Sequence, residues 1–395
     1  MHKGIEGRVF LLFPLYLKTK VAGLYIHIPY CKSKCTYCDF YSTPQVDTME
    51  QYVHSLLCEA QLRATEINGE AFTTLYLGGG TPSVLPLNLL TTLITRLDNI
   101  FDLSHVEEFT IEVNPDDVTH EYIEALGKLG VNRVSMGVQS FNDDELRTIN
   151  RRHSSQQAIE AVRAIQDAGI GNVSIDLIYG LPGQSLDSWR RNVEQAIKLD
   201  VQHISAYCLS YEHGTRLWVM REQGKVQEAS DELCIAMHNQ LVWMLKQTGF
   251  EHYEISNFAL PGYRSRHNSS YWNFIPYLGL GAAAHSFDGK VRRYNPSSIK
   301  KYINALDKNC TAFTEEHPYW FERYDEEVML RLRTSDGLDI SIIANRYGDQ
   351  TANGLLCKAQ KFIAQGLLKL NNNTLTLTPQ GVMMSDNIIR ELMWD

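Results

Sequence analysis

The sequence lacks an excess of positive charge. Its 37 Lys and Arg are outnumbered by 46 Asp and Glu, which gives a formal net charge of −9 at pH 7. Nucleic-acid binding needs clustered Lys and Arg that neutralise phosphates. We therefore expect no nucleic acid among the partners of this chain.

Long hydrophobic runs are also missing. The apolar stretch VFLLFPLYL, Val9–Leu17, is shorter than a membrane span, which needs about 20 apolar residues. No small-residue cleavage site of the usual kind follows it, as a signal peptide requires. We expect residues 1–20 to be an N-terminal extension of a cytoplasmic protein, and we keep peripheral membrane contact open for it.

The cysteines do not form a disulfide framework. Five of the eight are scattered along the chain: Cys58, Cys208, Cys234, Cys310 and Cys357. This usage is typical of reduced thiols in a cytosolic protein.

The other three cysteines, Cys31, Cys35 and Cys38, stand together in CKSKCTYCDF and are interpreted as metal ligands or catalysts. A zinc site would need a fourth ligand, which His27 could supply. An iron–sulfur cube held by three thiolates would keep one iron with an open position. Both alternatives remain open on the spacing alone.

Six short β-rich runs recur, each followed by a helical pattern. Strands that alternate with helices predict βαβ units and a parallel sheet. The runs are GLYIHI (Gly23–Ile28), TTLYLG (Thr73–Gly78), EFTIEV (Glu108–Val113), NRVSMGV (Asn132–Val138), NVSIDLI (Asn172–Ile178) and QHISAYC (Gln202–Cys208). We predict an α/β fold, an incomplete (β/α)6 barrel.

Polar and glycine-rich residues fall at the ends of these runs. The cysteines follow the first run, GGGTP follows the second, and Glu112, Gln139, Asp176 and Ser210 lie at the ends of the other four. In α/β barrels the carboxyl ends of the strands carry the active site. The sequence therefore predicts one site on this rim.

A chain of 395 residues exceeds the size of one ordinary core, so we expect more than one domain. The predicted division is an extension at 1–20, a barrel with its following segment at 21–290, and a C-terminal helical domain at 291–395. Tyr324–Asp395 contains helical patterns, a turn at Asn371–Asn373 inside an apolar hairpin, and a last helix, which predicts a winged-helix-like domain. From Asp325 to Asp395 there are seven Lys and Arg against nine Asp and Glu, so we expect a packing or docking domain.

The CxxxCxxC spacing directly after a strand resembles the signature of the radical S-adenosylmethionine (radical SAM) superfamily. The resemblance implies that Cys31, Cys35 and Cys38 bind three irons of a 4Fe–4S cluster. It also implies that the amino and carboxylate groups of S-adenosyl-L-methionine chelate the fourth iron.

The same resemblance implies a set of SAM-binding residues on the rim. The glycine run would lie against the methionine ammonium, Glu112 and Asp176 would meet ammonium or ribose, and Arg151, with Arg152 as its competitor, would bind the carboxylate. The alternative for the glycine run is an ordinary βα turn, and the alternative for Glu112 is a solvated carboxylate at a strand end. The implied set is Tyr25, Tyr37, Gly78, Gly79, Gly80, Thr81, Glu112, Gln139, Arg151 and Asp176.

Longer segments, including YIHIPYCKSKCTYCDF, YLGGGTPS and RVSMGVQSF, resemble the oxygen-independent coproporphyrinogen III oxidase group. One branch of that group decarboxylates coproporphyrinogen III, and the other, the radical SAM haem chaperones (HemW-type), binds haem and delivers it. The oxidase branch carries a fourth cysteine where this chain has Phe40. HNSSYW, His267–Trp272, resembles the HNxxYW motif of the chaperone branch.

The resemblance thus implies a haem chaperone whose partners are haem and haem-accepting proteins, with His267 as candidate haem ligand. The alternative for His267 is a hydrogen-bonded loop histidine. Two other functions stay open: a coproporphyrinogen III oxidase that tolerates Phe40, and a zinc-stabilised binding module.

Overall fold

The computed structural model describes residues 21–67 and 69–394. Two compact units divide these residues, one from Val21 to His317 and one from Pro318 onward. The predicted extension at 1–20, with its apolar stretch, lies outside the described residues. Within the described residues, no helix is long and apolar enough to cross a membrane.

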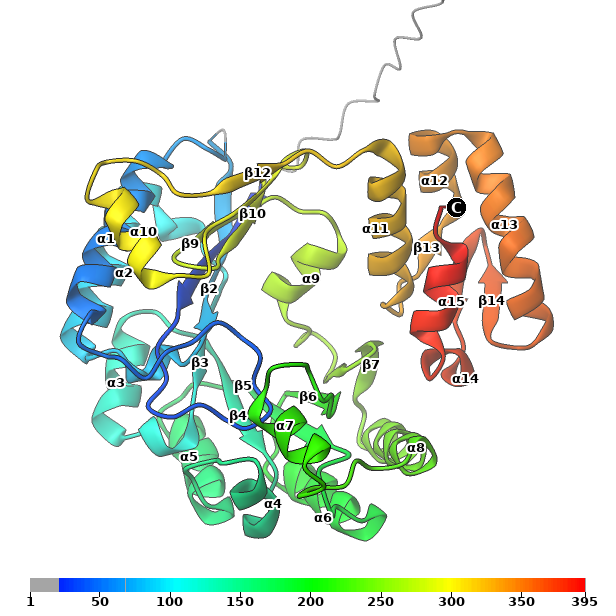
Figure 1. Cartoon of the computed structure of the whole chain (residues 1–395), viewed down its shortest axis with the longest axis horizontal. Coiled ribbons are helices and arrows are strands. Elements are labelled where there is room, and N and C mark those ends of the chain that lie inside the picture. Colours follow the sequence, from blue (N-terminus) through cyan, green and yellow to red (C-terminus); the bar gives the residue numbers. More distant parts are fainter. Residues whose placement is uncertain (1–20, 68, 395) are drawn as a thin grey trace, which may run out of the picture. The chain divides into compact units, whose positions relative to one another are not determined.

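Six parallel strands form the centre of the first unit, as the sequence predicts (Figure 1). Their order in the sheet is their order in the chain, and each is hydrogen-bonded in parallel to the next. The strands are β1 (Val21–Ile28), β2 (Ala71–Gly79), β3 (Glu108–Val113), β4 (Arg133–Gln139), β5 (Asn172–Tyr179) and β6 (His203–Cys208).

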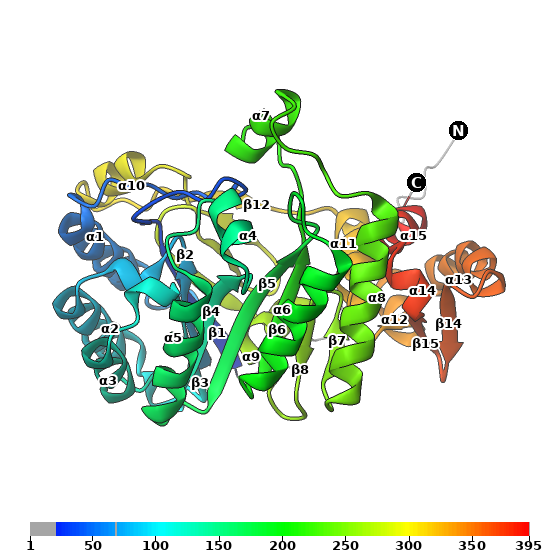
Figure 2. The same ribbon diagram turned by 90° about the horizontal axis from the view of Figure 1, so that it is seen from below.

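Helices cover the outer side of this curved sheet (Figure 2). Side chains alternate along β1, so that Leu24, Ile26 and Ile28 are buried in the main core while Tyr25 and His27 point to the inner side. The Tyr25 hydroxyl lies 3.0 Å from His27 Nδ1, so the two side chains share this face. The outer helices are α1 (Met49–Leu62), α2 (Leu87–Phe101), α3 (His120–Lys128), α4 (Asp143–Thr148), α5 (Ser155–Asp167), α6 (Leu186–Lys198) and α8 (Asp231–Gln247).

The described sheet has six further strands that the sequence did not indicate. On one side, β8 (Asn257–Ala259) pairs antiparallel with β6, and β7 (Glu251–Glu254) follows it. On the other side, β9 (Tyr277–Leu280) pairs parallel with β1 and leads into the antiparallel strands β10 (His285–Phe287), β11 (Arg292–Tyr294) and β12 (Thr314–Glu316). Helices α7 (Arg216–Glu222), α9 (Arg266–Trp272) and α10 (Ile299–Leu306) stand between these elements.

The predicted domain boundary at residue 290 is wrong. The first unit continues to His317, because β11 and β12 extend its sheet and α10 packs on α1. Residues of α10 such as Tyr302 and Ile303 belong to the main hydrophobic core. The change in sequence character near residue 290 therefore marks the end of the parallel barrel and not the end of the domain.

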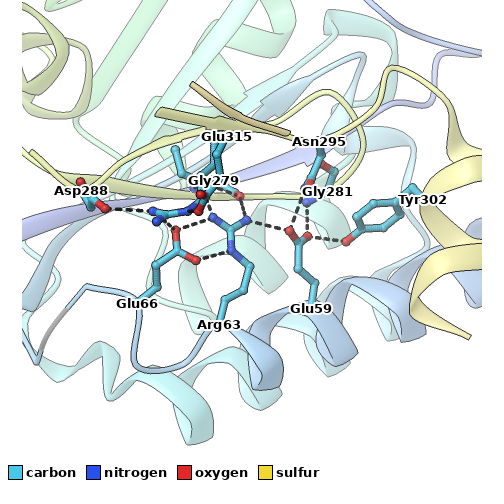
Figure 3. A network of polar contacts seen from close by, with 11 residues as sticks. Glu59, Arg63, Glu66, Gly279, Gly281, Asp288, Asn295, Tyr302 and Glu315 are labelled. Atoms are coloured by element: carbon cyan, nitrogen blue, oxygen red, sulfur yellow. Dashed lines mark hydrogen bonds and ion pairs between the residues drawn. The ribbon is translucent and has the colours of Figure 1, made fainter. Parts of the chain in front are cut away.

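A buried network of ion pairs and hydrogen bonds connects the added strands to α1 (Figure 3). The Arg63 guanidinium pairs with Glu59 at 2.8 Å and donates to the carbonyl oxygen of Gly279 and the hydroxyl of Ser286 at 3.0 and 2.8 Å. Glu59 accepts further hydrogen bonds from the backbone of Gly281 and the hydroxyl of Tyr302. Full pairing is what makes two buried charges tolerable.

The second unit is a helical domain with a small antiparallel sheet, as the winged-helix-like prediction required. Its sheet order is β13-β15-β14, and Asn372 and Asn373 turn the hairpin with φ of 46° and 67°, the conformation that favours Asn in two-residue hairpin loops. It has its own hydrophobic core. The elements are α11 (Trp320–Leu332), β13 (Leu338–Asp339), α12 (Ile340–Tyr347), α13 (Asp349–Ala364), β14 (Leu368–Asn371), β15 (Thr374–Leu377), α14 (Pro379–Val382) and α15 (Ser385–Leu392).

Candidate functional site

A pocket of about 470 Å³ lies at the carboxyl ends of the parallel strands in the first unit. Its volume is in the range of about 300–1,000 Å³ that is usual for small-molecule sites. The loop after β1 and the segments that end β2 to β6 all contribute to it. It is lined by most of the residues that the sequence singled out: Cys31, Cys35, Cys38, Tyr37, Gly79, Gly80, Thr81, Glu112, Gln139, Arg151 and Asp176.

The three cysteines stand on the loop between β1 and α1. Backbone hydrogen bonds hold this loop in place, from Cys31 to Thr43 at 3.0 Å and from Thr36 to Ile149 at 3.2 Å. All three are free thiols of intermediate exposure. Burial raises the pKa of the Cys31 thiol, and it raises that of Cys38 to about 11. These two metal-free thiols therefore stay protonated at neutral pH, and a metal must displace their protons.

His27, the fourth ligand that a zinc site would require, does not line the pocket. Its Nδ1 is 3.0 Å from the Tyr25 hydroxyl and its Nε2 is 3.4 Å from the carbonyl oxygen of Tyr41. Within residues 21–67 and 69–394, no three His, Cys, Asp or Glu side chains gather closely enough to hold one metal ion. The three cysteines nevertheless line the same pocket.

The glycine run at the end of β2 packs against neighbouring residues more closely than residues with side chains could. Gly79 has φ of +113°, and a Cβ there would lie 2.6–2.8 Å from the ring of His27. A Cβ on Gly80 would meet the backbone of Tyr30 at 2.8 Å. The geometry thus requires glycine at both positions, which an ordinary βα turn does not.

Among the carboxyl groups that line the pocket, two stand on the parallel strands themselves, Glu112 on β3 and Asp176 on β5. Glu112 accepts hydrogen bonds from the Tyr76 hydroxyl at 2.8 Å and from the backbone N–H of Gly79 at 3.1 Å. Burial raises the pKa of Glu112 to about 7 and that of Asp176 to about 6, and the negative charge of Asp176 adds to the shift of Glu112. Glu112 is therefore a hydrogen-bonded carboxyl group shielded from solvent, and the alternative of a solvated carboxylate does not describe it.

The two neighbouring arginines occupy different environments. Arg151 donates from Nη1 to the Cys35 sulfur at 3.4 Å and from Nη2 to Asn114 Oδ1 at 2.7 Å. Arg152 forms ion pairs with Asp116 and Asp117. Arg151 thus turns its charge toward the cysteines, while the charge of Arg152 is neutralised nearby.

Gln139 ends β4 in a strained conformation. Its φ is +69°, and the pairing of β4 with β5 shifts register between Gly137 and Gln139. Bulges and positive φ in a non-glycine residue re-aim side chains and concentrate at functional sites. The bulge places Gln139 in the pocket wall.

Comparison with known proteins places this site in a family. The model of the radical SAM superfamily matches residues 25–196, and that of the HemN C-terminal domain matches residues 322–384. A relative from Lactococcus lactis, named heme chaperone HemW, is 33% identical over 385 residues, which cover 95% of this chain and 98% of the relative. The chain belongs to the HemW family of radical SAM proteins.

Other members and a solved structure extend the comparison. A mitochondrial zebrafish protein, radical S-adenosyl methionine domain-containing protein 1, is 35% identical over 94% of this chain and 87% of its own length. HemN from Escherichia coli, a coproporphyrinogen III oxidase, superposes with a TM-score of 0.82 over 94% of this chain and 90% of its own, at 23% identity. At that identity the likeness establishes the shared fold.

Three of the expected site residues lie elsewhere in this HemW-family chain: Gly78, Tyr25 and His267 do not line the pocket. Tyr25 and His267 belong to an aromatic stack inside the barrel, where the His267 ring lies 5.1 Å from that of Tyr76. Gly78 supports the site indirectly, since a Cβ there would press on Tyr76 and Glu112.

His267 is not presented to a ligand. Its side chain is 1% exposed, with Nδ1 at 2.8 Å from Thr74 Oγ1 and Nε2 at 2.8 Å from the Tyr271 hydroxyl. Burial lowers the pKa of the ring to about 3, so it is neutral. The alternative interpretation of a hydrogen-bonded histidine describes this arrangement, except that the residue lies in helix α9 and not in a loop.

Asn114 and Tyr207 are among the pocket residues that were not predicted from the sequence. Asn114 bridges Arg151 and Thr81, donating to the Thr81 hydroxyl at 3.3 Å. In the sequence, only the position of Asn114 directly after the third strand could have indicated that it belongs to the site. Tyr207, 44% exposed at the end of β6, also lines the pocket and carried no signal beyond its place in a β-rich run.

Proposed function

We propose that this chain is a cytoplasmic haem chaperone that holds a 4Fe–4S cluster and SAM, binds haem and passes it to acceptor proteins. The observation that carries the proposal is the near-full-length similarity to proteins named heme chaperone HemW, of which the relatives from Lactococcus lactis and Bacillus subtilis are 33% and 32% identical. The pocket at the strand ends supplies its chemical basis.

Cys31, Cys35 and Cys38 would hold the cluster. Their thiols line one pocket, and Arg151 donates to the Cys35 sulfur, which stabilises the thiolate that a metal needs. A cluster with three thiolates leaves one iron open to an exchangeable ligand. In radical SAM proteins such a cluster supplies an electron to the bound SAM.

The remaining residues of the pocket would hold SAM. Gly79 and Gly80 pack against His27 and the backbone of Tyr30 too closely for any side chain, which would hold the end of β2 beside the methionine end of SAM. Glu112 and Asp176 are acceptors for its ammonium and hydroxyl groups, and the amide of Gln139 can orient it. The guanidinium of Arg151 would meet its carboxylate. Tyr37, whose pKa burial raises, closes the pocket on the side of the cysteine loop.

Phe40 supports the chaperone branch over the oxidase branch. It occupies the place of the fourth cysteine of the oxidase motif, lines the mouth of the pocket and is 66% exposed. An exposed phenyl ring can neither ligate a metal nor transfer a proton. The alternative function, oxidative decarboxylation of coproporphyrinogen III, would have to proceed without the chemistry of that thiol.

Haem loading and transfer test the proposal. The full chain is reconstituted anaerobically with iron and sulfide, loaded with haemin, separated from free haemin and mixed with an apo-haemoprotein. We expect the Soret band of the chain to fall while that of the acceptor rises. A chain that takes up no haemin, or that keeps it against an apo-haemoprotein present in excess, would contradict the chaperone function.

A further inference from the structure

Arg133, the first residue of β4, has a buried guanidinium, and the residue is 1% exposed. Among residues 21–67 and 69–394, nothing accepts a hydrogen bond from its Nε or Nη1, and no carboxylate forms an ion pair with it. Arg63 and Arg151 differ, since Arg63 pairs with Glu59 and Arg151 donates to Asn114. Because an arginine keeps its positive charge throughout the ordinary pH range, Arg133 brings an unpaired charge into the interior.

Arg133 faces the inside of the barrel. The residues that alternate with it along β4 belong to the main hydrophobic core: Val134, Met136 and Val138. Since side chains alternate along a strand, Arg133 shares the inner face with Ser135 and Gly137. Those two residues line the pocket. Arg133 therefore stands on the face that forms the pocket wall, one position further inside the barrel than Ser135.

The neighbouring strand adds a second donor. Thr110 of β3 lies beside Arg133 in the parallel register and is fully buried. It shares the inner face of β3 with Glu112, which is two residues further along the strand. Its Oγ1 likewise has no hydrogen-bond partner in the described part of the chain. Adjacent strands thus present a guanidinium and a hydroxyl to which the protein itself offers no acceptor.

Other polar side chains of the barrel interior are engaged elsewhere. The His203 ring lies with Nδ1 at 2.7 Å from Ser174 Oγ and with Nε2 at 2.8 Å from the Tyr253 hydroxyl. Burial, followed by the positive charge of Arg133, lowers the pKa of His203, so this ring is neutral at pH 7. Glu108 accepts hydrogen bonds from two backbone N–H groups at the start of α9. Neither residue compensates the guanidinium directly.

The pocket carboxyl groups Glu112 and Asp176 feel the charge of Arg133 without pairing with it. Burial raises the pKa of Glu112 to about 7 and that of Asp176 to about 6, and the charge of Arg133 is among the effects that oppose these rises. The Glu112 carboxyl is held by the Tyr76 hydroxyl and the backbone of Gly79. At neutral pH and below, both carboxyl groups are partly protonated, which leaves the guanidinium without a full counter-charge.

We propose that Arg133 and Thr110 bind a small monovalent anion, such as chloride or formate, inside the barrel beyond the pocket. A guanidinium offers several N–H donors in a fixed arrangement, and a threonine hydroxyl can donate to the same acceptor. A buried charge is tolerated when a partner compensates it, and an anion supplies both the charge and the acceptor atoms. The site uses none of the residues proposed to hold the cluster or SAM, and it does not depend on haem binding.

Thermal unfolding of the full chain tests this site. Sodium chloride and sodium formate are each titrated against the sodium salt of a bulky sulfonate, so that ionic strength stays constant. The proteins are wild type, Arg133→Met, Thr110→Val and Arg190→Gln, each first checked for native circular dichroism. Arg190→Gln is the control for the loss of an arginine, because Arg190 is a surface residue of α6 that pairs with Asp187 and Glu194.

A ligand of the folded state raises stability along a curve that saturates with its concentration. We expect both small anions to raise the unfolding temperature of wild type and of Arg190→Gln along such a curve. Arg133→Met should show no saturable response. Thr110→Val, which keeps the shape of the side chain and removes its hydroxyl, should need an anion concentration about tenfold higher for the same effect.

Three results would overturn the proposal. The first is a wild type that responds to the small anions no more than to the sulfonate. The second is an equal response in wild type and Arg133→Met, or, if Arg133→Met does not fold, an unshifted curve in Thr110→Val. The third is loss of the response in Arg190→Gln, which would place the anion on the surface of the protein.

Discussion

Arg151 donates a hydrogen bond from Nη1 to the sulfur of Cys35 at 3.4 Å, which joins the segment after β4 to the cysteine loop after β1. The residues are 116 positions apart in the chain. A cation beside a thiol favours the thiolate that binds metal. One guanidinium thus lies where it can act on both the cluster loop and the proposed SAM carboxylate.

This arrangement predicts different effects for the two neighbouring arginines. Arg151→Ala should weaken SAM binding about 10- to 150-fold, because a charge-assisted hydrogen bond contributes roughly 1.5–3 kcal/mol. Arg152→Ala should change it much less, since Arg152 is neutralised by Asp116 and Asp117. Calorimetric SAM binding to variants of equal iron content is the measurement, and equal losses in the two would show that the distinction is wrong.

Gly79 should not tolerate a side chain. Its φ is +113°, and a Cβ at this position would lie only 2.6–2.8 Å from the His27 ring, so Gly79→Ala must displace the turn that faces the cysteines. We expect lower thermal stability and loss of SAM binding. Gly127→Ala in α3 is the control, because nothing lies within 4 Å of its Cβ position, and it should stabilise the protein by up to about 1 kcal/mol. Normal SAM binding by Gly79→Ala would contradict the claim that this position requires glycine.

Glu112 should make stability depend on pH. Its folded-state pKa of about 7 lies above the ordinary value of 4.5, so ionisation is harder in the folded protein and stability falls as pH rises from about 4.5 to 7. Glu112→Gln removes this loss and should raise stability at pH 8 by about 1–3 kcal/mol, with little change at pH 4.5. Thermal unfolding at both pH values decides the matter, and an equal effect at the two would contradict the shift.

The affinity for SAM should also depend on the ionisation of Glu112 and Asp176, but it should rise with pH where stability falls. The ammonium and hydroxyl groups of SAM need ionised acceptors, so binding favours the deprotonated forms of Glu112 and Asp176. Affinity should therefore rise from about pH 5.5 to about pH 8 and level off above the raised pKa values. In Glu112→Gln the affinity should be low and its remaining pH dependence shallower. Calorimetric titrations across this range are the measurement, and an affinity that falls with rising pH would contradict the assignment.

His267 should be structural. Its ring bonds Thr74 and Tyr271 and stacks on Tyr76, so His267→Ala leaves a cavity and two unpaired hydroxyls. We expect a loss of about 2–5 kcal/mol in the free energy of unfolding. Asn268→Ala, a change in the same motif on a half-buried side chain, is the control and should cost far less. A His267→Ala variant with wild-type stability would contradict this role.

The sequence predicted the parallel barrel and most of the pocket because both depend on local patterns. Each of the six strands is a β-rich run, and the residues that follow a run must meet the others at one edge of a parallel sheet. Asp176 and Cys31 could therefore be placed together without a structure. The choice of Arg151 over Arg152 likewise followed from the resemblance, and the contacts of Arg151 are consistent with it.

The added strands could not be predicted in the same way. Strands β10 to β12 have three residues each, and β11 has the sequence RRY, which has no apolar alternation. Their polar contacts come from far along the chain: Ser286 of β10 is hydrogen-bonded to Arg63, and Arg293 of β11 pairs with Glu66, both more than 200 residues earlier. The same limit applies to His267, whose motif marked it as special but whose burial depends on partners in β2 and β3.

The central claim is that this pocket belongs to a haem chaperone and not to an oxidase, and one measurement tests it directly. Reconstituted wild-type chain is incubated anaerobically with coproporphyrinogen III, SAM and reductant, and the porphyrinogens are separated by chromatography, with a coproporphyrinogen III oxidase of the HemN type as positive control. The account predicts no decarboxylated product from the chain, while the same preparation transfers haem to an apo-haemoprotein. Multiple-turnover decarboxylation by the wild-type chain would contradict it.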